Sequence, residues 1–152
     1  FSAKIEAYYY PDEFEECDGS KELVPGVSAG QQPRKSFGFS YQTIIGNDTK
    51  RNAYGRKIHL IYGCTAKPSE RSNATVNESP EAVTLSWELS TVAAAIAMDG
   101  FKPSAKITID STKVDPAKLK KLEDLLYGTA GAEASLPTPD AVAALIGTPA
   151  TP

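Results

Sequence analysis

Hydrophobic and polar residues alternate along much of the first two thirds of the chain, as they do in half-buried β-strands. The alternation predicts strands over residues 2–10, 35–45, 56–65, 82–92 and 105–109. In the clearest of these, one face carries Phe37, Phe39, Tyr41, Thr43 and Ile45. The alternation is lost in the next segment, residues 93–98, which we assign to a strand packed on both faces in preference to a short helix.

The hydrophobic period becomes helical towards the C-terminus, where two segments have the same start and stop residues. The first, over 116–127, begins with a capping aspartate and a proline and ends before Gly128. The second, over 139–146, begins with a threonine and a proline and ends before Gly147. Proline suits the first helical position and glycine follows helix ends, so both segments are predicted helices. Residues 148–152 form a tail.

The remaining segments are polar connections, predicted as loops over 18–34, 46–55 and 66–81, with one helical turn near residues 12–16. Runs of strands followed by helices indicate a mainly β (α+β) fold. We expect a single domain over residues 1–147, an antiparallel β-sandwich or partly open barrel with flanking helices. Because the chain begins inside its first strand, we also expect a preceding segment that supplies a neighbouring strand.

Composition excludes several classes of function. The chain has 152 residues, 41% of them hydrophobic and 23% charged, which is typical of a globular domain. Its net charge of −3 argues against a DNA-gripping surface, which needs clustered lysine and arginine. No apolar run approaches the roughly 20 residues that cross a bilayer, so no membrane partner is expected.

Few residues are arranged for chemistry. His59 is the only histidine and has no second ligand at metal spacing, so we expect a structural role for it. The acidic run over 12–16 is typical of a solvated face, and no phosphate-binding or dinucleotide motif is present. For Cys17 and Cys64 we favour two free thiols over a disulfide. We therefore expect no enzyme activity, no cofactor and no metal; a hydrolase using a serine, His59 and an acid is the weakest alternative.

Four segments together resemble a known family. They are Ile-Glu-Ala-Tyr-Tyr-Tyr-Pro-Asp-Glu-Phe at 5–14, Phe-Gly-Phe-Ser-Tyr at 37–41, Lys-Leu-Glu-Asp-Leu-Leu-Tyr-Gly at 121–128, and Leu-Pro-Thr-Pro-Asp-Ala-Val-Ala-Ala-Leu-Ile-Gly at 136–147. In this order and spacing, which cover most of the chain, they resemble the major tail proteins, or tail tube proteins, of siphophages, the bacteriophages with long non-contractile tails.

The resemblance implies a structural protein of the virion. Tail tube proteins form a β-sandwich or barrel with a flanking helix; six copies close into a ring, and rings stack into a tube. The implied partners are other copies of the chain in homo-hexamer rings, the tape-measure protein, and the tail terminator and distal tail proteins. DNA would pass through the lumen without sequence-specific binding. The implied location is the phage tail, assembled in the host cytoplasm.

Within that frame, polar strand faces are candidates for the wall of the lumen, where mild acidity would repel phosphate. The expected lumen residues are Glu88, Ser86, Ser90 and Thr84. Basic residues at loop ends and exposed aromatic rings are typical of contacts between subunits. The expected contact residues are Arg34, Lys50, Arg51, Tyr54, Tyr8 and Tyr10.

A second hypothesis comes from a different class of protein. A monomeric β-sandwich that serves in adhesion or binds carbohydrate would have the same strand pattern. In that case loop aromatics such as Tyr54 would contact the ligand.

Overall fold

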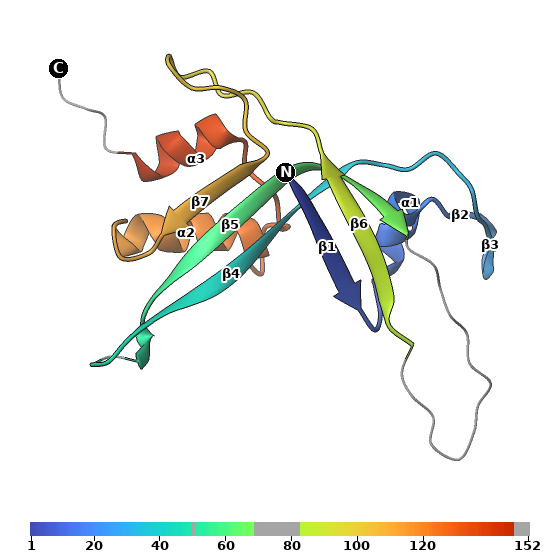
Figure 1. Ribbon diagram of the computed structural model, residues 1–152, viewed down its shortest axis with the longest axis horizontal. Coiled ribbons are helices and arrows are strands. Elements are labelled where there is room, and N and C mark those ends of the chain that lie inside the picture. Colours follow the sequence, from blue (N-terminus) through green and yellow to red (C-terminus); the bar gives the residue numbers. More distant parts are fainter. Residues whose placement is uncertain (50, 69–82, 148–152) are drawn as a thin grey trace. The chain divides into compact units, whose positions relative to one another are not determined.

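A computed structural model describes residues 1–49, 51–68 and 83–147 (Figure 1). The fold is mainly β, with antiparallel strand pairs and few helices, as the sequence predicts, and within the described residues the strands do not close into a barrel. In place of one body over residues 1–147, the chain forms two compact units. The first contains Phe1–Phe37 and Gly63–Val92, and the second contains Gly38–Tyr62 and Ala93–Pro152.

The first unit is built on three antiparallel strands, with β6 between β1 and the C-terminal part of β5. A short helical segment follows β1 at the place where the acidic run predicts a helical turn. The elements of this unit are β1 (Ser2–Ala7), η1 (Asp12–Phe14), α1 (Glu15–Asp18), β2 (Lys21–Val24), β3 (Val27–Ala29), the end of β5 (Arg51–Pro68) and β6 (Leu85–Thr91).

One face of this three-stranded sheet is apolar and covered by aromatic rings. Trp87 is buried on β6, directly opposite Ile5 of β1. Tyr10 and Phe14 pack edge-on against the indole, with ring centroids 5.6 and 5.3 Å away. The indole nitrogen donates a hydrogen bond to the Asp18 carboxylate, so the only tryptophan joins the sheet to α1.

The two cysteines are free and buried, as favoured from the sequence. Burial raises the pKa of both thiols, of Cys17 and of Cys64. Neither is therefore primed to react as a thiolate at neutral pH.

The second unit contains the two C-terminal helices at the predicted bounds. In this unit β5 has β4 and β7 as its neighbours. Asp115 accepts hydrogen bonds from the backbone N–H groups of Ala117 and Lys118, and Thr138 accepts one from Ala141, so both predicted caps are confirmed. The elements are β4 (Phe37–Asn47), the start of β5, β7 (Lys106–Asp110), α2 (Pro116–Tyr127) and α3 (Pro139–Ile146).

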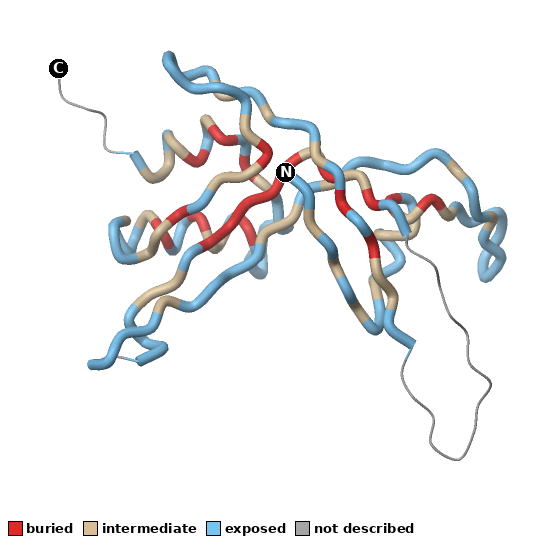
Figure 2. Tube along the Cα trace, viewed as in Figure 1, coloured by how far each residue is buried: buried red, intermediate tan, exposed pale blue. Residues whose placement is uncertain are grey.

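The core of the second unit lies between the sheet and the helices. Buried side chains from β5, β7, α2 and α3 form a hydrophobic cluster. The buried stretches of these elements are red in Figure 2. The Tyr62 hydroxyl is satisfied inside this core because it donates to the Pro137 carbonyl at 2.9 Å. The buried members are Ile58, Leu60, Tyr62, Ile109, Leu119, Leu122, Leu126 and Val142.

The prediction of a continuous loop over residues 18–34 is wrong. Residues 21–24 and 27–29 form an antiparallel hairpin, β2–β3, which is a separate two-stranded sheet. Gly26 has a φ of 83°, which favours glycine, and it follows Pro25 at the turn. The strands are too short for alternation to reveal them, but proline-glycine between two valine-containing runs is a turn signal.

Other boundaries also differ from the sequence prediction. β1 ends at Ala7 instead of residue 10, and β5 runs to Pro68, into the predicted loop over 66–81, whose remainder lies outside the described residues. Residues 93–98 are not a strand and make one isolated bridge, between Ala94 and Ser104. The predicted loop over 46–55 is much shorter, because β4 continues to Asn47 and β5 begins at Arg51. Tyr54 therefore lies on a strand. An exposed strand needs no apolar face, so the polar residues of this hairpin show no alternation. The sequence pattern therefore does not reveal these parts of β4 and β5.

The core predicts a clear contrast between two neighbouring leucines of α2. Leu122 is fully buried, whereas Leu125 is 39% exposed. Leu122→Ala removes buried methyl groups and leaves a cavity, so we expect a loss of about 2–5 kcal/mol in the free energy of unfolding. Leu125→Ala, the matched control, should cost about 1 kcal/mol or less. Urea unfolding measures both, and equal losses would contradict this assignment of the core.

Candidate functional site

The polar face of the first unit is the surface on which the sequence predicts function. Residues at positions 2, 4 and 6 of β1 and 86, 88 and 90 of β6 share this face by alternation. The ladder with β5 adds two residues to it. The cross-strand rows are Ser2, Ser90 and Thr65; Lys4, Glu88 and Lys67; and Glu6 with Ser86.

The central row alternates in charge. Glu88 lies directly between Lys4 on β1 and Lys67 on β5, and opposite charges in such cross-strand positions attract. Lys4 also forms an ion pair of 2.7 Å with Glu6. The hydrogen bond and charge of Glu6, with a smaller contribution from Glu88, raise the pKa of Lys4. This face is therefore balanced in charge, and it does not provide the acidic wall that the sequence led us to expect.

The predicted lumen residues lie on this polar face or beside it. Glu88 and Ser90 are exposed on β6, and Ser86 is half-buried. Thr84 is exposed and immediately precedes β6. The alternation thus places the strand residues on one polar face, while the lysines that neutralise Glu88 come from other strands. Their position in a lumen stays a prediction.

The predicted contact residues lie on both compact units. Tyr8 is 75% exposed, but Tyr10 is half-buried and packs inside its own unit on Phe14 and Trp87. Arg51 and Tyr54 are exposed on β5. Lys50 lies outside the described residues. The role of these residues in contacts between subunits stays a prediction.

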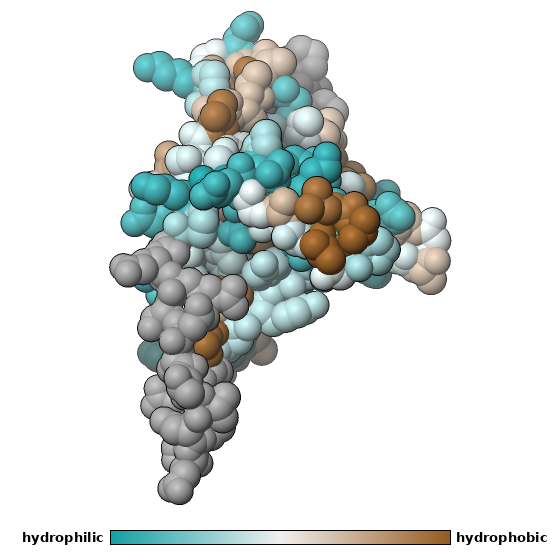
Figure 3. All heavy atoms as spheres, turned by 90° about the vertical axis from the view of Figure 1, so that its right-hand side faces the viewer, coloured by the Kyte–Doolittle hydropathy of each residue, from teal (hydrophilic) through white to brown (hydrophobic). Residues whose placement is uncertain are grey.

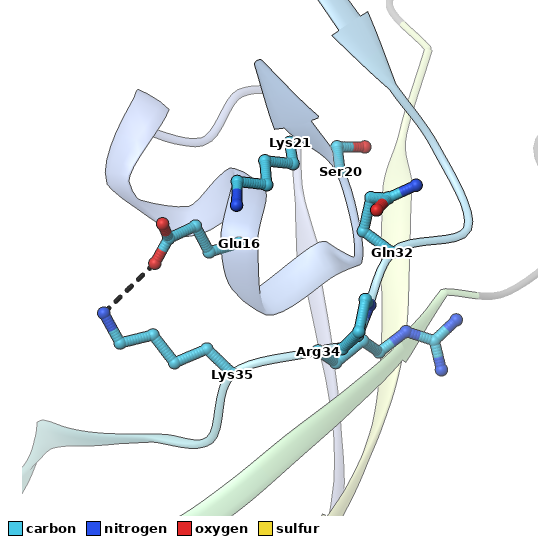
Figure 4. A pocket seen from close by; sticks show the side chains of 7 residues that line it. Glu16, Ser20, Lys21, Gln32, Arg34 and Lys35 are labelled. Carbon is cyan, nitrogen blue, oxygen red and sulfur yellow. Dashed lines mark hydrogen bonds and ion pairs between the residues drawn. The ribbon is translucent and has the colours of Figure 1, made fainter. Parts of the chain in front are cut away.

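Arg34, the remaining predicted contact residue, lines a polar hollow of about 470 Å³ beside α1 (Figure 4). The backbone N–H of Lys35 donates to the Glu16 carbonyl at 3.0 Å, and its ammonium pairs with the Glu16 carboxylate at 3.1 Å. The Arg34 side chain points away from that ion pair (Figure 4), and its Nε donates to the Asp18 carbonyl at 3.4 Å.

This hollow has more cations than anions. Lys21, Arg34 and Lys35 line it with a single carboxylate, that of Glu16. A carboxylate from another molecule would be attracted here by Coulomb forces. Sequence reasoning identified Arg34 but missed Lys21. The β2–β3 hairpin places Lys21 in the same hollow as residues 32–35, and alternation does not reveal this hairpin.

His59 is held by neighbours that favour a structural role. Its Nε2 lies 2.9 Å from the Thr43 hydroxyl and its Nδ1 lies 3.1 Å from the Thr108 hydroxyl. Tyr41 stacks on the ring, with centroids 4.5 Å apart. Burial, assisted by the charges of Lys106 and Lys57, lowers the pKa of His59. A catalytic base of the triad type is oriented by a carboxylate, and here a hydroxyl occupies that position.

The described residues hold no group of three or more histidine, cysteine, aspartate or glutamate side chains placed to bind a metal ion. In the same part of the chain, no helix is both long and apolar enough to span a membrane.

No family model, curated protein or solved structure matches this chain.

The environment of His59 predicts how stability depends on pH. The unfolded chain binds the imidazole proton near the ordinary pKa of 6.5, whereas the folded chain binds it only at lower pH. The contribution of this group to the free energy of unfolding is therefore complete above pH 6.5 and is lost as the pH falls through the folded pKa.

Proton NMR of the single imidazole measures that pKa directly. We expect a midpoint below 6.5, and a His59→Gln variant whose unfolding free energy lacks this part of the pH dependence. A midpoint at or above 6.5 would show that burial and the two lysines do not set the pKa of His59.

Proposed function

We propose that this chain is the tail tube subunit of a long-tailed bacteriophage, a structural protein that works by assembling copies of itself. The observation that carries the proposal is an edge strand in each compact unit. Among the described strands, β1 pairs only with β6, and β4 pairs only with β5. An edge strand is a template for pairing with another chain, and strand pairing repeated around a ring removes such edges.

The exposed apolar residues support assembly over a monomeric role. Apolar and aromatic side chains at the surface favour contact with other molecules, and aromatic rings are enriched at interfaces. Here large apolar side chains are exposed on both units, on strands and on the segments between them. The strongest examples are Tyr8, Tyr9, Leu23, Val24, Ile44, Val92 and Phe101, each more than half exposed.

The sequence resemblance adds the finer description. Under the proposal the sheets belong to a tail-tube-like β-sandwich or partly open barrel, six copies form each ring, and stacked rings form the tube. The tape-measure protein would fill the tube during assembly in the host cytoplasm, and the tail terminator and distal tail proteins would contact its ends. The finished subunit would reside in the virion, with no catalytic function.

The polar face of β1, β6 and β5 is the proposed wall of the lumen. Its hydroxyls can hydrogen-bond to water, and its alternating charges give no cluster of cations that would trap phosphate. DNA would therefore slide along it. The net charge of −3 would also repel the phosphates of DNA and so favour its passage.

Electron microscopy tests the class of protein. We expect negatively stained preparations of concentrated protein, or of protein mixed with an assembly initiator from the same tail, to contain rings or tubes with a central hole. Edge-strand pairing is the driving contact. Uniform small particles under both conditions would contradict the proposal and favour the monomeric binding module, for which the 44% exposed Tyr54 is the candidate contact.

A charge reversal tests the lumen wall. Glu88→Lys would place three lysines in one row, because Lys4 and Lys67 are its cross-strand neighbours. We expect tubes that retain DNA and virions that eject it at least several-fold more slowly. The control is Glu133→Lys, the same change at an exposed residue of the second unit. Ejection at the normal rate by the Glu88→Lys virion, measured by dye-labelled DNA release, would remove this face from the lumen.

A further inference from the structure

Charge is divided unequally between the two compact units. The first unit contains eleven acidic and six basic residues, whereas the second contains eight acidic and ten basic residues. Their net charges at neutral pH are therefore −5 and +2, which together give the −3 of the whole chain. Opposite charges attract unlike surfaces of different copies, whereas equal charges keep like surfaces apart. The division therefore favours contacts in which the first unit of one copy meets the second unit of another.

The negative charge of the first unit is most concentrated in η1 and α1. Four of the five residues over 12–16 carry carboxylates, and the ammonium of Lys35 pairs with one of them, Glu16, at 3.1 Å. Asp12 and Glu13 are exposed, and neither forms an ion pair with any described residue. On the side of the molecule that carries α1, hydrophilic residues surround a small hydrophobic patch (Figure 3). Asp12 and Glu13, which we term the acidic turn, are therefore open to cations of another molecule.

In the second unit, lysines gather around β7. Lys57 of β5 is the direct cross-strand neighbour of Asp110 on β7. Lys106 lies on the same sheet face as Lys57, because it pairs with Ile61, four positions further along β5. Lys113 follows β7 in a turn, where its backbone N–H donates to the Asp110 carbonyl at 3.1 Å. These three lysines, which we term the basic cluster, therefore lie around a single aspartate.

The aspartate does not cancel the charge of the basic cluster. Two hydrogen bonds from Thr112 lower the pKa of Asp110, and the nearby charges of Lys113 and Lys57 lower it further. Lys57 and Lys113 are both exposed, and neither forms an ion pair with any described residue. One carboxylate among three ammonium groups leaves an excess of positive charge. A carboxylate from outside the chain would therefore be attracted to this surface.

We propose that the acidic turn of one copy docks on the basic cluster of another copy. The inference rests on the proposed function and deepens it by assigning the two halves of one contact between subunits. The two surfaces differ, so the contact is heterologous, and it either closes into a ring or continues as a stack. In this contact the ammonium groups of Lys57 and Lys113 pair with the two carboxylates of the acidic turn. Because such exposed pairs are screened by ions, added salt should weaken association.

Charge reversal on each side, followed by mixing, tests the contact. The acid-reversed variant carries Asp12→Lys and Glu13→Lys, and the lysine-reversed variant carries Lys57→Glu and Lys113→Glu. Each variant alone presents like charges at both surfaces, so we expect it to stay monomeric where the unaltered chain assembles. In an equimolar mixture each surface finds an opposite partner on the other variant, so assembly should return. Light scattering and analytical ultracentrifugation measure the assembled fraction.

Controls separate a lost contact from lost folding. A chain with Lys121→Glu and Glu133→Lys keeps the net charge, changes exposed residues outside the two surfaces, and should assemble as the unaltered chain does. Fluorescence of Trp87, which packs on Phe14 of η1, reports the folding of the first unit in the acid-reversed variant.

A milder change covers the possibility that two glutamates beside Asp110 unfold the second unit. Lys57→Gln with Lys113→Gln removes the charges without adding repulsion, and it should lower the assembled fraction and its dependence on salt. Urea unfolding checks that this variant is folded.

Microscopy of the same samples separates the two proposals. If a folded reversed or neutral variant alone assembles as the unaltered chain does, or if the folded reversed variants do not assemble on mixing, the docking contact is overturned. Rings or tubes of the unaltered chain with a central hole would then leave the proposed function standing. Recovery on mixing that gives open chains without a hole would support the contact and overturn the tube. An unaltered chain that stays monomeric, even with an assembly initiator, would overturn both.

Discussion

The structure depends on strand β5, which serves both compact units. Its residues Ile58 to Tyr62 are buried without interruption, so this part of the strand is covered on both faces. Its later residues pair with β6 in the first unit. Gly63 stands at the junction with a φ of 59°, and a Cβ atom there would collide with the Val92 carbonyl. Only glycine fits at this point, where the neighbour of β5 changes from β7 to β6 within one five-stranded sheet.

The two compact units carry different kinds of surface. The first unit has a polar sheet face whose charges cancel along a row, together with an exposed apolar hairpin. The second unit has an apolar groove of about 1030 Å³ lined by residues of β7 and α3. Its one imidazole is held between two hydroxyls, with a lowered pKa. Under the proposed function, the polar face would serve the passage of DNA and the exposed apolar surfaces would serve contact between copies, because contacts need complementary area.

Sequence reasoning succeeded where the signal is local. The caps at Asp115 and Thr138 and the prolines that follow them define both helices within a few residues. Alternation over residues 85–91 gives the correct inward side chains, Trp87 and Leu89. It failed for the β2–β3 hairpin, whose short strands are exposed throughout most of their length, so that burial imposes no period on them. It also failed for residues 93–98, where small apolar residues fit a strand and an irregular segment equally well.

The sequence by itself determined the mainly β class, the two capped helices and the polar face of β6, because each follows from residues close together in the chain. Only the tertiary structure decided which residues meet. Lys4, Glu88 and Lys67 form one row because β6 pairs with both β1 and β5. The groove combines a strand edge, a helix and a connecting segment. Such pairings are set by strand register and core packing across the whole chain, and a local pattern carries no information about either.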